Sequence, residues 1–132
     1  MNAPAWLAQQ GPDLLGEGEL AFAPAQQEAA AALAQTVISP LAHLGAIRAS
    51  GTEAELFLQG QLSNDLRRLG AAQAQLSSYN SPKGRVLDLL VLRRDSDSIL
   101  LEARHDTLGA TLKRLRMFVL RSKVALEDLG AR

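Results

Sequence analysis

Residues 72–103 read AQAQLSSYNSPKGRVLDLLVLRRDSDSILLEA, and their pattern is the strongest indication of fold class in the chain. Polar and apolar side chains alternate over residues 72–79, which predicts a half-buried strand. Residues 85–93 are nearly all apolar and predict a central strand, and residues 98–103 predict a third. NSPKG at 80–84 and the later DSD are typical of turns. We therefore expect three consecutive antiparallel strands.

One helix is predicted on each side of these strands. The first runs from Thr52, the expected N-cap, to about residue 69, with acidic residues in its first turn. The second covers residues 108–120, with Asp106 or Thr107 as its cap. Its apolar positions follow the spacing of a core-facing helix and are Leu108, Leu112, Leu115 and Val119.

Two further strands complete the predicted unit, at residues 43–50 and 123–128. The order is then β-α-β-β-β-α-β, which favours an α+β fold with a mainly antiparallel sheet and two helices. We expect two regions. Residues 1–40 form an N-terminal arm with a short Ala-rich helix at 25–38, and residues 41–132 form the folded unit.

Composition limits the chemistry of this chain of 132 residues. It contains no cysteine and two histidines, so thiolate sites, a Cys nucleophile and a zinc site built on imidazole are not expected. No serine has an identifiable His–Asp partnership, so we predict no catalytic residues and no metal ligands. No apolar run reaches the roughly 18 residues that span a bilayer. A cytoplasmic protein without a membrane partner is the expectation.

Charge is distributed unevenly along the chain. Residues 1–65 carry seven acidic residues and one basic residue, whereas residues 66–132 carry seven acidic and thirteen basic residues. The two halves either complement each other within one fold, or the basic half meets an anion. The KRLR run at 113–116 has the same two interpretations, as a solvated helix face or as an electrostatic RNA contact.

Two segments carry candidate binding residues. In FLQGQLSND, residues 57–65, the amides of Gln61 and Asn64 could recognise the edge of a flat heterocycle, or could simply be helix surface. In YNSPKGRVLD, residues 79–88, Lys83 and Arg85 flank a glycine. Such a turn can offer cations and backbone donors to a carboxylate or phosphate, or can be a solvated hairpin.

Asp88 is a third candidate, because it lies inside an apolar strand between two leucines. A carboxylate in such a strand either lines a pocket or lies on a solvated sheet face.

The motifs together resemble one known family. FLQGQLSNDL at 57–66, SYNSPKGRVLDLLVLR at 78–93 and LKRLRMFVLRSKVALED at 112–128 are similar to segments of the YgfZ-type folate-binding proteins, relatives of the glycine-cleavage T-protein aminomethyltransferases. The resemblance covers roughly residues 41–128. It implies that the chain is the first half of a duplicated folate-binding domain, because the family's later KGCYxGQE segment has no match here.

The resemblance also implies a function. It implies tetrahydrofolate as the cofactor and an accessory role in maintaining iron–sulfur proteins, which would be partners, with RNA and tRNA modification involved only indirectly. The residues expected to contact folate are Gln61, Asn64, Tyr79, Lys83, Arg85 and Asp88.

Two departures from the family bear on catalysis. Leu44 stands where some relatives have a tryptophan, and Leu87-Asp88 stands where T-proteins have paired acids. Loss of one acid disfavours aminomethyl transfer, because proton transfer at the folate needs a positioned carboxylate. A binding protein is therefore the leading hypothesis, a folate-dependent aminomethyltransferase the second and an RNA-contacting domain the third.

Overall fold

The structure, a computed structural model, describes residues 13–14, 20–41 and 43–131. In its N-terminal part, strand β1 (Asp13–Leu14) pairs antiparallel with β2 (Leu20–Ala21), and helix α2 (Ala25–Ala34) follows. The predicted Ala-rich helix is confirmed, but it ends four residues early because Gln35 is already extended. Glu28, in the first turn of α2, fixes the segment before the helix. One of its carboxylate oxygens accepts the backbone N–H groups of residues 22 and 23.

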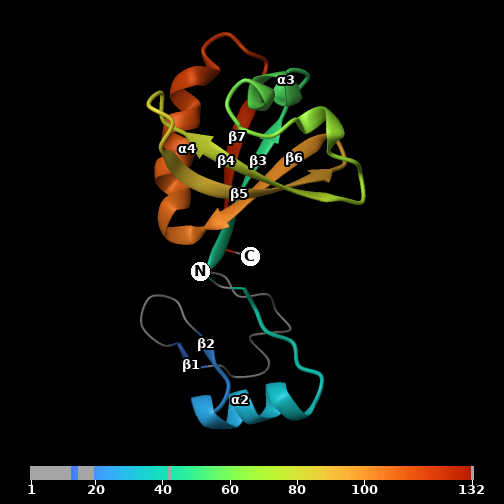
Figure 1. Cartoon of the computed structure of the whole chain (residues 1–132), viewed down its shortest axis with the longest axis vertical. Helices are drawn as coiled ribbons and strands as arrows, with labels where there is room; N and C mark the ends of the chain where they lie inside the picture. The colour runs from blue at the N-terminus through green and yellow to red at the C-terminus, as the bar shows by residue number, and fades with distance from the viewer. Residues whose placement is uncertain (1–12, 15–19, 42, 132) are drawn as a thin grey trace.

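The main unit is an antiparallel sheet (Figure 1). Its five strands in the described part of the chain are β3 (Leu44–Ser50), β4 (Ala74–Asn80), β5 (Val86–Asp95), β6 (Ser98–Arg104) and β7 (Ala125–Ala131). They lie in the order β4-β5-β6-β3-β7, and every neighbouring pair is antiparallel. The predicted α+β class and sheet type are therefore confirmed.

Helices α3 (Ala54–Gln59) and α4 (His105–Val119) pack against one face of this sheet (Figure 1). A short 3-10 turn, η2 (Leu66–Arg68), follows α3 and packs on the same face. The predicted inward face of α4 is confirmed, since three of its leucines are buried in the core and Val119 packs against it. The side chains that fill the layer between helices and sheet include Ile47, Phe57, Leu58, Tyr79, Leu90, Leu92 and Leu101.

The first predicted helix was too long. It ends at Gln59, and the chain then turns to run along β4. The N–H of Leu62 still bonds the carbonyl of Leu58, at 3.0 Å, but the next N–H, of Ser63, donates to the carbonyl of Ser78 instead. The free edge of β4 therefore takes over the backbone donors that a continuing helix would have used.

The predicted helix caps were also wrong. The residue before α3 is Glu53 rather than Thr52, and no side chain caps the helix. Helix α4 begins at His105, ahead of both predicted caps. Asp106 pairs with Arg104 instead, and the Thr107 hydroxyl donates to the carboxylate of Asp88 on β5. At α4, both predicted capping side chains thus bond other side chains.

The opposite face of the sheet has no helix over it in the described part of the chain. On the β4–β5 half, alternation brings Leu76, Leu87 and Leu89 to this face, with exposed fractions of 63%, 39% and 59%. We call this the open apolar face. Further along the same face, charged pairs join β5 to β6, such as Arg93 with Glu102 at 3.0 Å. One side of the sheet is thus a core layer and the other is exposed.

Arg94 ties the loop around η2 to the sheet. Its guanidinium donates to the carbonyls of Leu69 and Leu66, at 2.7 and 3.4 Å, and to the carboxylate of Glu55 at 2.6 Å. We expect Arg94→Met to lower the free energy of unfolding by about 1–2 kcal/mol, because these bonds have a charged donor and are partly sheltered. Urea unfolding measures the loss.

The neighbouring arginine supplies the control for this substitution. Arg93 makes one exposed pair on the open face, so Arg93→Met should cost no more than about 1 kcal/mol. Equal losses for the two variants would show that the η2 contacts contribute nothing specific.

Candidate functional site

The polar segment after α3 is a loop held on the edge of β4. Leu62 forms a β-bridge with Tyr79, and the N–H of Asn64 donates to the hydroxyl of Ser77 at 3.1 Å. The Ser63 hydroxyl accepts the N–H of Ser78 at 2.9 Å. These contacts cover the edge of β4, which would otherwise present unpaired backbone groups to solvent.

The two predicted amide contacts differ in how they are engaged. Both ends of the Asn64 amide are used, since its nitrogen donates to the carbonyl of Leu76 at 2.9 Å and its oxygen accepts the N–H of Asp65 at 2.9 Å. Gln61 is half-buried, and its amide makes no hydrogen bond to any other described residue. Asn64 therefore fixes the loop, whereas Gln61 retains its donors and acceptor.

Tyr79 and Asp88 are opposite one another on β4 and β5, and both are buried on the face that the helices cover. Asp88 is 7% exposed. Its carboxylate accepts the hydroxyl of Thr111 at 2.6 Å, that of Thr107 at 3.0 Å and the N–H of Leu89 at 3.0 Å. Of the two interpretations of Asp88, the solvated sheet face is excluded, and its contact with folate remains a prediction.

The β4–β5 turn presents two cations. Gly84 has a positive φ of 76°, and the turn is closed by the N–H of Ser81 donating to the carbonyl of Arg85 at 2.8 Å. The N–H groups of Gly84 and Arg85 bond back to Ser81, so these two donors are not free for a ligand. Lys83 and Arg85 are exposed and form no ion pair with a described residue.

The fold brings most of the predicted residues to one end of the β4–β5 hairpin. Those grouped there by the strand register, the bridge and the turn are Gln61, Tyr79, Lys83, Arg85 and Asp88. Asn64 lies further along β4, beside Leu76. We call the first five residues the hairpin-end group. It combines an uncommitted amide, two uncommitted cations and a buried carboxylate.

Two aspartates outside this group have shifted acidities. The side-chain hydrogen bond from Arg67 lowers the pKa of Asp65 below its usual value of 3.8, and that from Arg104 does the same to the pKa of Asp106. A lowered folded-state pKa gives stability that is present above the usual value and is lost as the pH falls through the folded one. Asp106 is exposed and the Asp65 side chain is 33% exposed, so solvent screens the effect at both groups.

Within residues 13–14, 20–41 and 43–131, no three His, Asp or Glu side chains gather as a metal site would need. No helix in that part of the chain has the length and apolar character to cross a bilayer.

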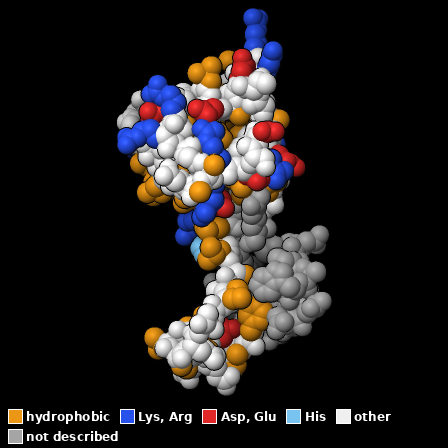
Figure 2. Space-filling model, turned by 90° about the vertical axis from the view of Figure 1, so that its right-hand side faces the viewer, with side chains coloured by type: hydrophobic (Ala, Val, Ile, Leu, Met, Phe, Trp, Pro, Cys, Tyr) orange, Lys and Arg blue, Asp and Glu red, His pale blue; other side chains and the backbone are white. Residues whose placement is uncertain are grey.

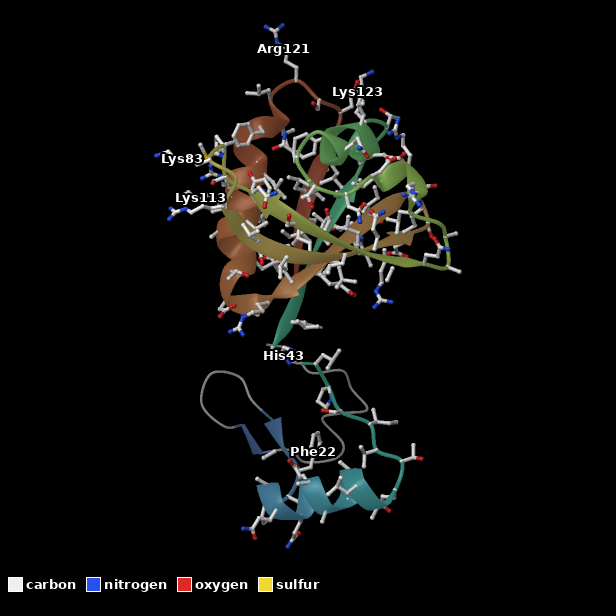
Figure 3. All side chains as sticks on the ribbon, viewed as in Figure 1. Phe22, His43, Lys83, Lys113, Arg121 and Lys123 are labelled. Atoms are coloured by element: carbon white, nitrogen blue, oxygen red, sulfur yellow. The ribbon has the colours of Figure 1, made fainter. Side chains whose placement is uncertain are left out.

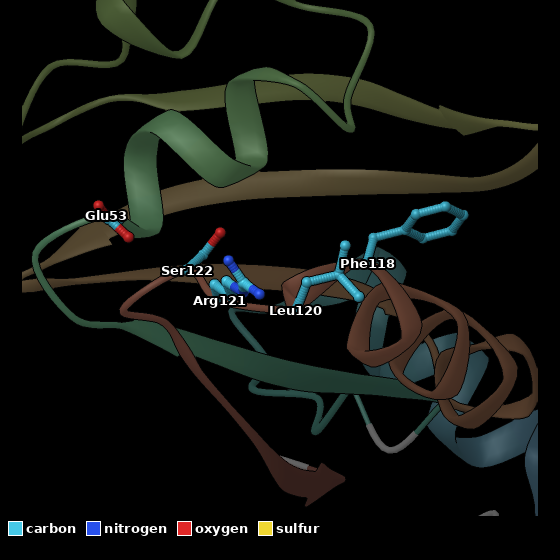
Figure 4. Close-up of a pocket in the computed structure, with 5 residues that line it drawn as sticks. All are labelled: Glu53, Phe118, Leu120, Arg121 and Ser122. Carbon is cyan, nitrogen blue, oxygen red and sulfur yellow. The ribbon is translucent and has the colours of Figure 1, made fainter.

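A shallow, open depression beside the end of α4 was not predicted from the sequence. It has a volume of about 720 Å³ and is lined by Glu53, Phe118, Leu120, Arg121 and Ser122. Phe118 and Leu120 lie at one end and Glu53 at the other (Figure 4). A sequence signal existed, since Phe118 interrupts the basic side of a helix that needs no further apolar residue.

Known proteins similar to this chain include tRNA-modifying proteins YgfZ and an aminomethyltransferase. A tRNA-modifying protein YgfZ from an Enterobacter species is 34% identical over 105 residues, which are 80% of this chain and 32% of that protein. The one from Colwellia psychrerythraea is 30% identical over 76% of this chain and 32% of its own length. An aminomethyltransferase from Exiguobacterium sibiricum is 32% identical over 81% of this chain and 30% of its own.

A solved structure shows the same fold. The glycine cleavage system aminomethyltransferase T from Bartonella henselae matches with a TM-score of 0.63 and 23% identity, over 68% of this chain and 25% of that one. No protein-family model matches the chain. The chain spans about a third of the length of the curated relatives.

Proposed function

The chain is a relative of the YgfZ-type proteins, and from that premise we propose that it is part of a folate-binding protein of this type. The observation that carries the proposal is similarity to both YgfZ proteins and aminomethyltransferases, joined to an aminomethyltransferase-like fold. The proposed protein is cytoplasmic and maintains iron–sulfur proteins, and it affects tRNA modification through them.

The hairpin-end group offers chemistry that fits folate. The Gln61 amide can pair with donors and acceptors on the pterin edge, while Lys83 and Arg85 can attract the carboxylates of the glutamate tail. Asp88 has three of roughly four acceptor positions occupied, so one remains for a ring N–H or amino group. Asn64 belongs to the proposed site as the residue that fixes the loop carrying Gln61.

We also propose that this chain supplies only one part of the folate site. Two observations support this: the relatives are about three times as long, and the open apolar face exposes three leucines. Apolar surface of this kind is commonly covered by further protein or by a ligand. A partial site should bind folate weakly.

Titration with tetrahydrofolate, followed by NMR of the ¹⁵N-labelled chain, tests the proposal. We expect a dissociation constant weaker than about 10 μM, on the order of −7 kcal/mol, because part of the site is missing. Shifts should be confined to the loop at 60–65, the β4–β5 turn and the residues around Asp88. Absence of shifts at millimolar folate would contradict folate binding, and submicromolar affinity would contradict the partial site.

Two variants and a fragment of the ligand sharpen this test. Replacing both Lys83 and Arg85 with glutamine should weaken tetrahydrofolate binding, yet leave binding of a tetrahydropterin without the glutamate tail unchanged. Arg93→Gln is the matched control, since Arg93 is also on β5 but is paired with Glu102. If the double substitution weakened the binding of both ligands equally, the β4–β5 turn would not be the part of the site that binds the glutamate tail.

One-carbon transfer is the second candidate, because aminomethyltransferases are among the relatives. Side chains of successive strand residues point to opposite faces, so the residues beside Asp88 on the open apolar face are Leu87 and Leu89. Neither can move a proton. Binding without transfer is therefore the better-supported function, and detectable release of ammonia and methylene-folate from an aminomethylated carrier would reverse this order.

A further inference from the structure

Positive charge is concentrated on one segment of the molecule. Residues 107–126 contain five basic residues and no acidic residue. In contrast, on the face shown in Figure 2, Lys and Arg side chains of the sheet domain lie among Asp and Glu side chains. The five arginines of the described residues that form ion pairs, all outside this segment, are Arg48, Arg67, Arg93, Arg94 and Arg104.

Four of these cations lie on the outer side of α4 and the loop that follows it. Lys113, Arg121 and Lys123 are exposed, and Arg114 is half-buried. Figure 3 shows Lys113 pointing outward from α4, and Arg121 and Lys123 extending beyond its C-terminal end. None of the four pairs with a carboxylate among the described residues. The Arg114 Nε is buried yet has no hydrogen-bond partner there.

An aromatic ring lies among these cations. Phe118 follows Arg114 by one helical turn, is 45% exposed, and shares the open depression with Arg121. The core face of the helix, which includes Leu108, Leu112 and Leu115, is already complete without it. An exposed ring between unpaired cations is the pattern with which proteins bind a charged backbone that carries flat bases.

The loop after α4 is held in place. The N–H of Lys123 donates to the carboxylate of Glu53 at 2.6 Å, and the N–H of Glu53 donates back to the carbonyl of Lys123 at 3.4 Å. Leu120 adopts a positive φ of 45°, which for leucine costs free energy and persists because the surrounding contacts impose it. Arg121 therefore projects from an ordered turn, which reduces the entropy lost on binding.

We propose that the outer side of α4 and the loop at 120–123 bind single-stranded nucleic acid. The phosphates pair with Lys113, Arg114, Arg121 and Lys123, and one base stacks on Phe118 in the open depression. The four cations are distributed along α4 and the loop that follows it, and they do not converge on one point. An extended polyanion therefore fits them better than a single small anion. The surface shares no residue with the hairpin-end group, although α4 also carries Thr107 and Thr111, which bond Asp88. The test substitutes Arg121 and Phe118, neither of which belongs to that group, so it does not depend on folate binding.

Fluorescence anisotropy with labelled oligonucleotides of 12 uridines or 12 thymidines tests this proposal on the whole chain. With four phosphate contacts, the logarithm of the affinity should fall with the logarithm of salt concentration with a slope of about −3, or roughly fiftyfold between 50 and 200 mM. The two oligonucleotides distinguish RNA from DNA as the preferred source of this backbone. A preference for either oligonucleotide supports the proposed nucleic-acid-binding surface.

Single substitutions separate the phosphate contacts from the base stacking. Arg121→Gln should weaken binding severalfold and reduce the slope by about 0.7, since one phosphate contact is lost. Phe118→Ala should weaken binding about tenfold without changing the slope, because stacking releases no counterions. Phe118→Leu keeps the apolar volume and should lose nearly as much. Arg93→Gln is the control and should change neither quantity.

Three results would overturn the proposal. One is absence of binding at 50 mM salt and 100 μM protein. Another is equal binding of a polyglutamate peptide, which would indicate an acidic protein partner instead. The third is an Arg93→Gln loss as large as that of Arg121→Gln, which would reduce the effect to overall charge.

Discussion

Asp88→Ala is expected to lower the melting temperature of the chain by about 10–20 °C, which corresponds to about 2–4 kcal/mol. The substitution removes the acceptor of the Thr111 hydroxyl, and Thr111 is only 4% exposed. A buried donor without a partner keeps its full desolvation cost. The cost at Thr107 is smaller, because its hydroxyl can donate to the carbonyl of Arg104, at 3.2 Å.

Two further variants separate charge, shape and position in this prediction. Asp88→Asn keeps the shape and one acceptor, and a threonine hydroxyl can accept from the new amide, so the loss should be below about 1.5 kcal/mol. Asp97→Ala, in the exposed β5–β6 turn, should change stability by no more than about 0.5 kcal/mol. Thermal unfolding followed by circular dichroism measures all three. A melting temperature for Asp88→Ala equal to that of Asp97→Ala would refute the structural role.

The same position tests the proposed folate contact. If the remaining acceptor of Asp88 holds a pterin donor, Asp88→Asn should weaken folate binding about ten- to a hundredfold, since a charged hydrogen bond is lost. A purely structural Asp88 predicts a lower melting temperature with unchanged affinity. The two measurements are independent, so either role can be rejected without the other.

Gly51→Ala is expected to destabilise the fold by more than about 3 kcal/mol. Gly51 has a φ of 110°, which only glycine adopts without strain, and an added Cβ would overlap the backbone carbonyl of Lys123. Because the obstacle is backbone, no side-chain rotation relieves it. The loop at 120–124 would have to separate from the start of α3, where the N–H of Glu53 donates to the same carbonyl.

Gly84 offers a matched control for this substitution. Its φ is also positive, at 76°, but an added Cβ there meets nothing within 4 Å. Gly84→Ala should therefore cost only the conformational term, about 1–2 kcal/mol. Urea unfolding of both variants measures the difference. Equal losses would mean that the contact between Gly51 and Lys123 does not constrain the fold.

Much of the sheet followed from local signals in the sequence. The strand predicted at residues 85–93 is observed as Val86–Asp95, because an apolar run between two turn motifs leaves little choice of length or type. Burial of Leu108, Leu112 and Leu115 likewise follows from helical periodicity. These features depend on neighbours within a few residues.

The errors and omissions involve partners far away in the sequence. Helical periodicity continues past Gln59, but the edge of β4, formed some 15 residues later, captures the N–H of Ser63. Similarly, the alternation of β5 could not show which face Asp88 occupies, since its partners Thr107 and Thr111 follow 19 and 23 residues later. The group at the hairpin end could be proposed from the sequence, whereas the contacts within it could not.

The position of β3 has a consequence for how the chain is made. It is the first strand of the sheet to leave the ribosome, yet it lies inside the sheet between β6 and β7, the two strands of the sheet that follow latest in the chain. Ile47, for example, pairs with Leu101 on one side and Asp128 on the other. Until those residues emerge, β3 has no strand partner, and its buried side chains depend on chaperones or on the nascent α3 for cover. The β4–β5–β6 meander can form from local contacts, so it is the expected folding nucleus. Strand β3 can then pair with β6, and β7 covers the other edge of β3 once it has been synthesised.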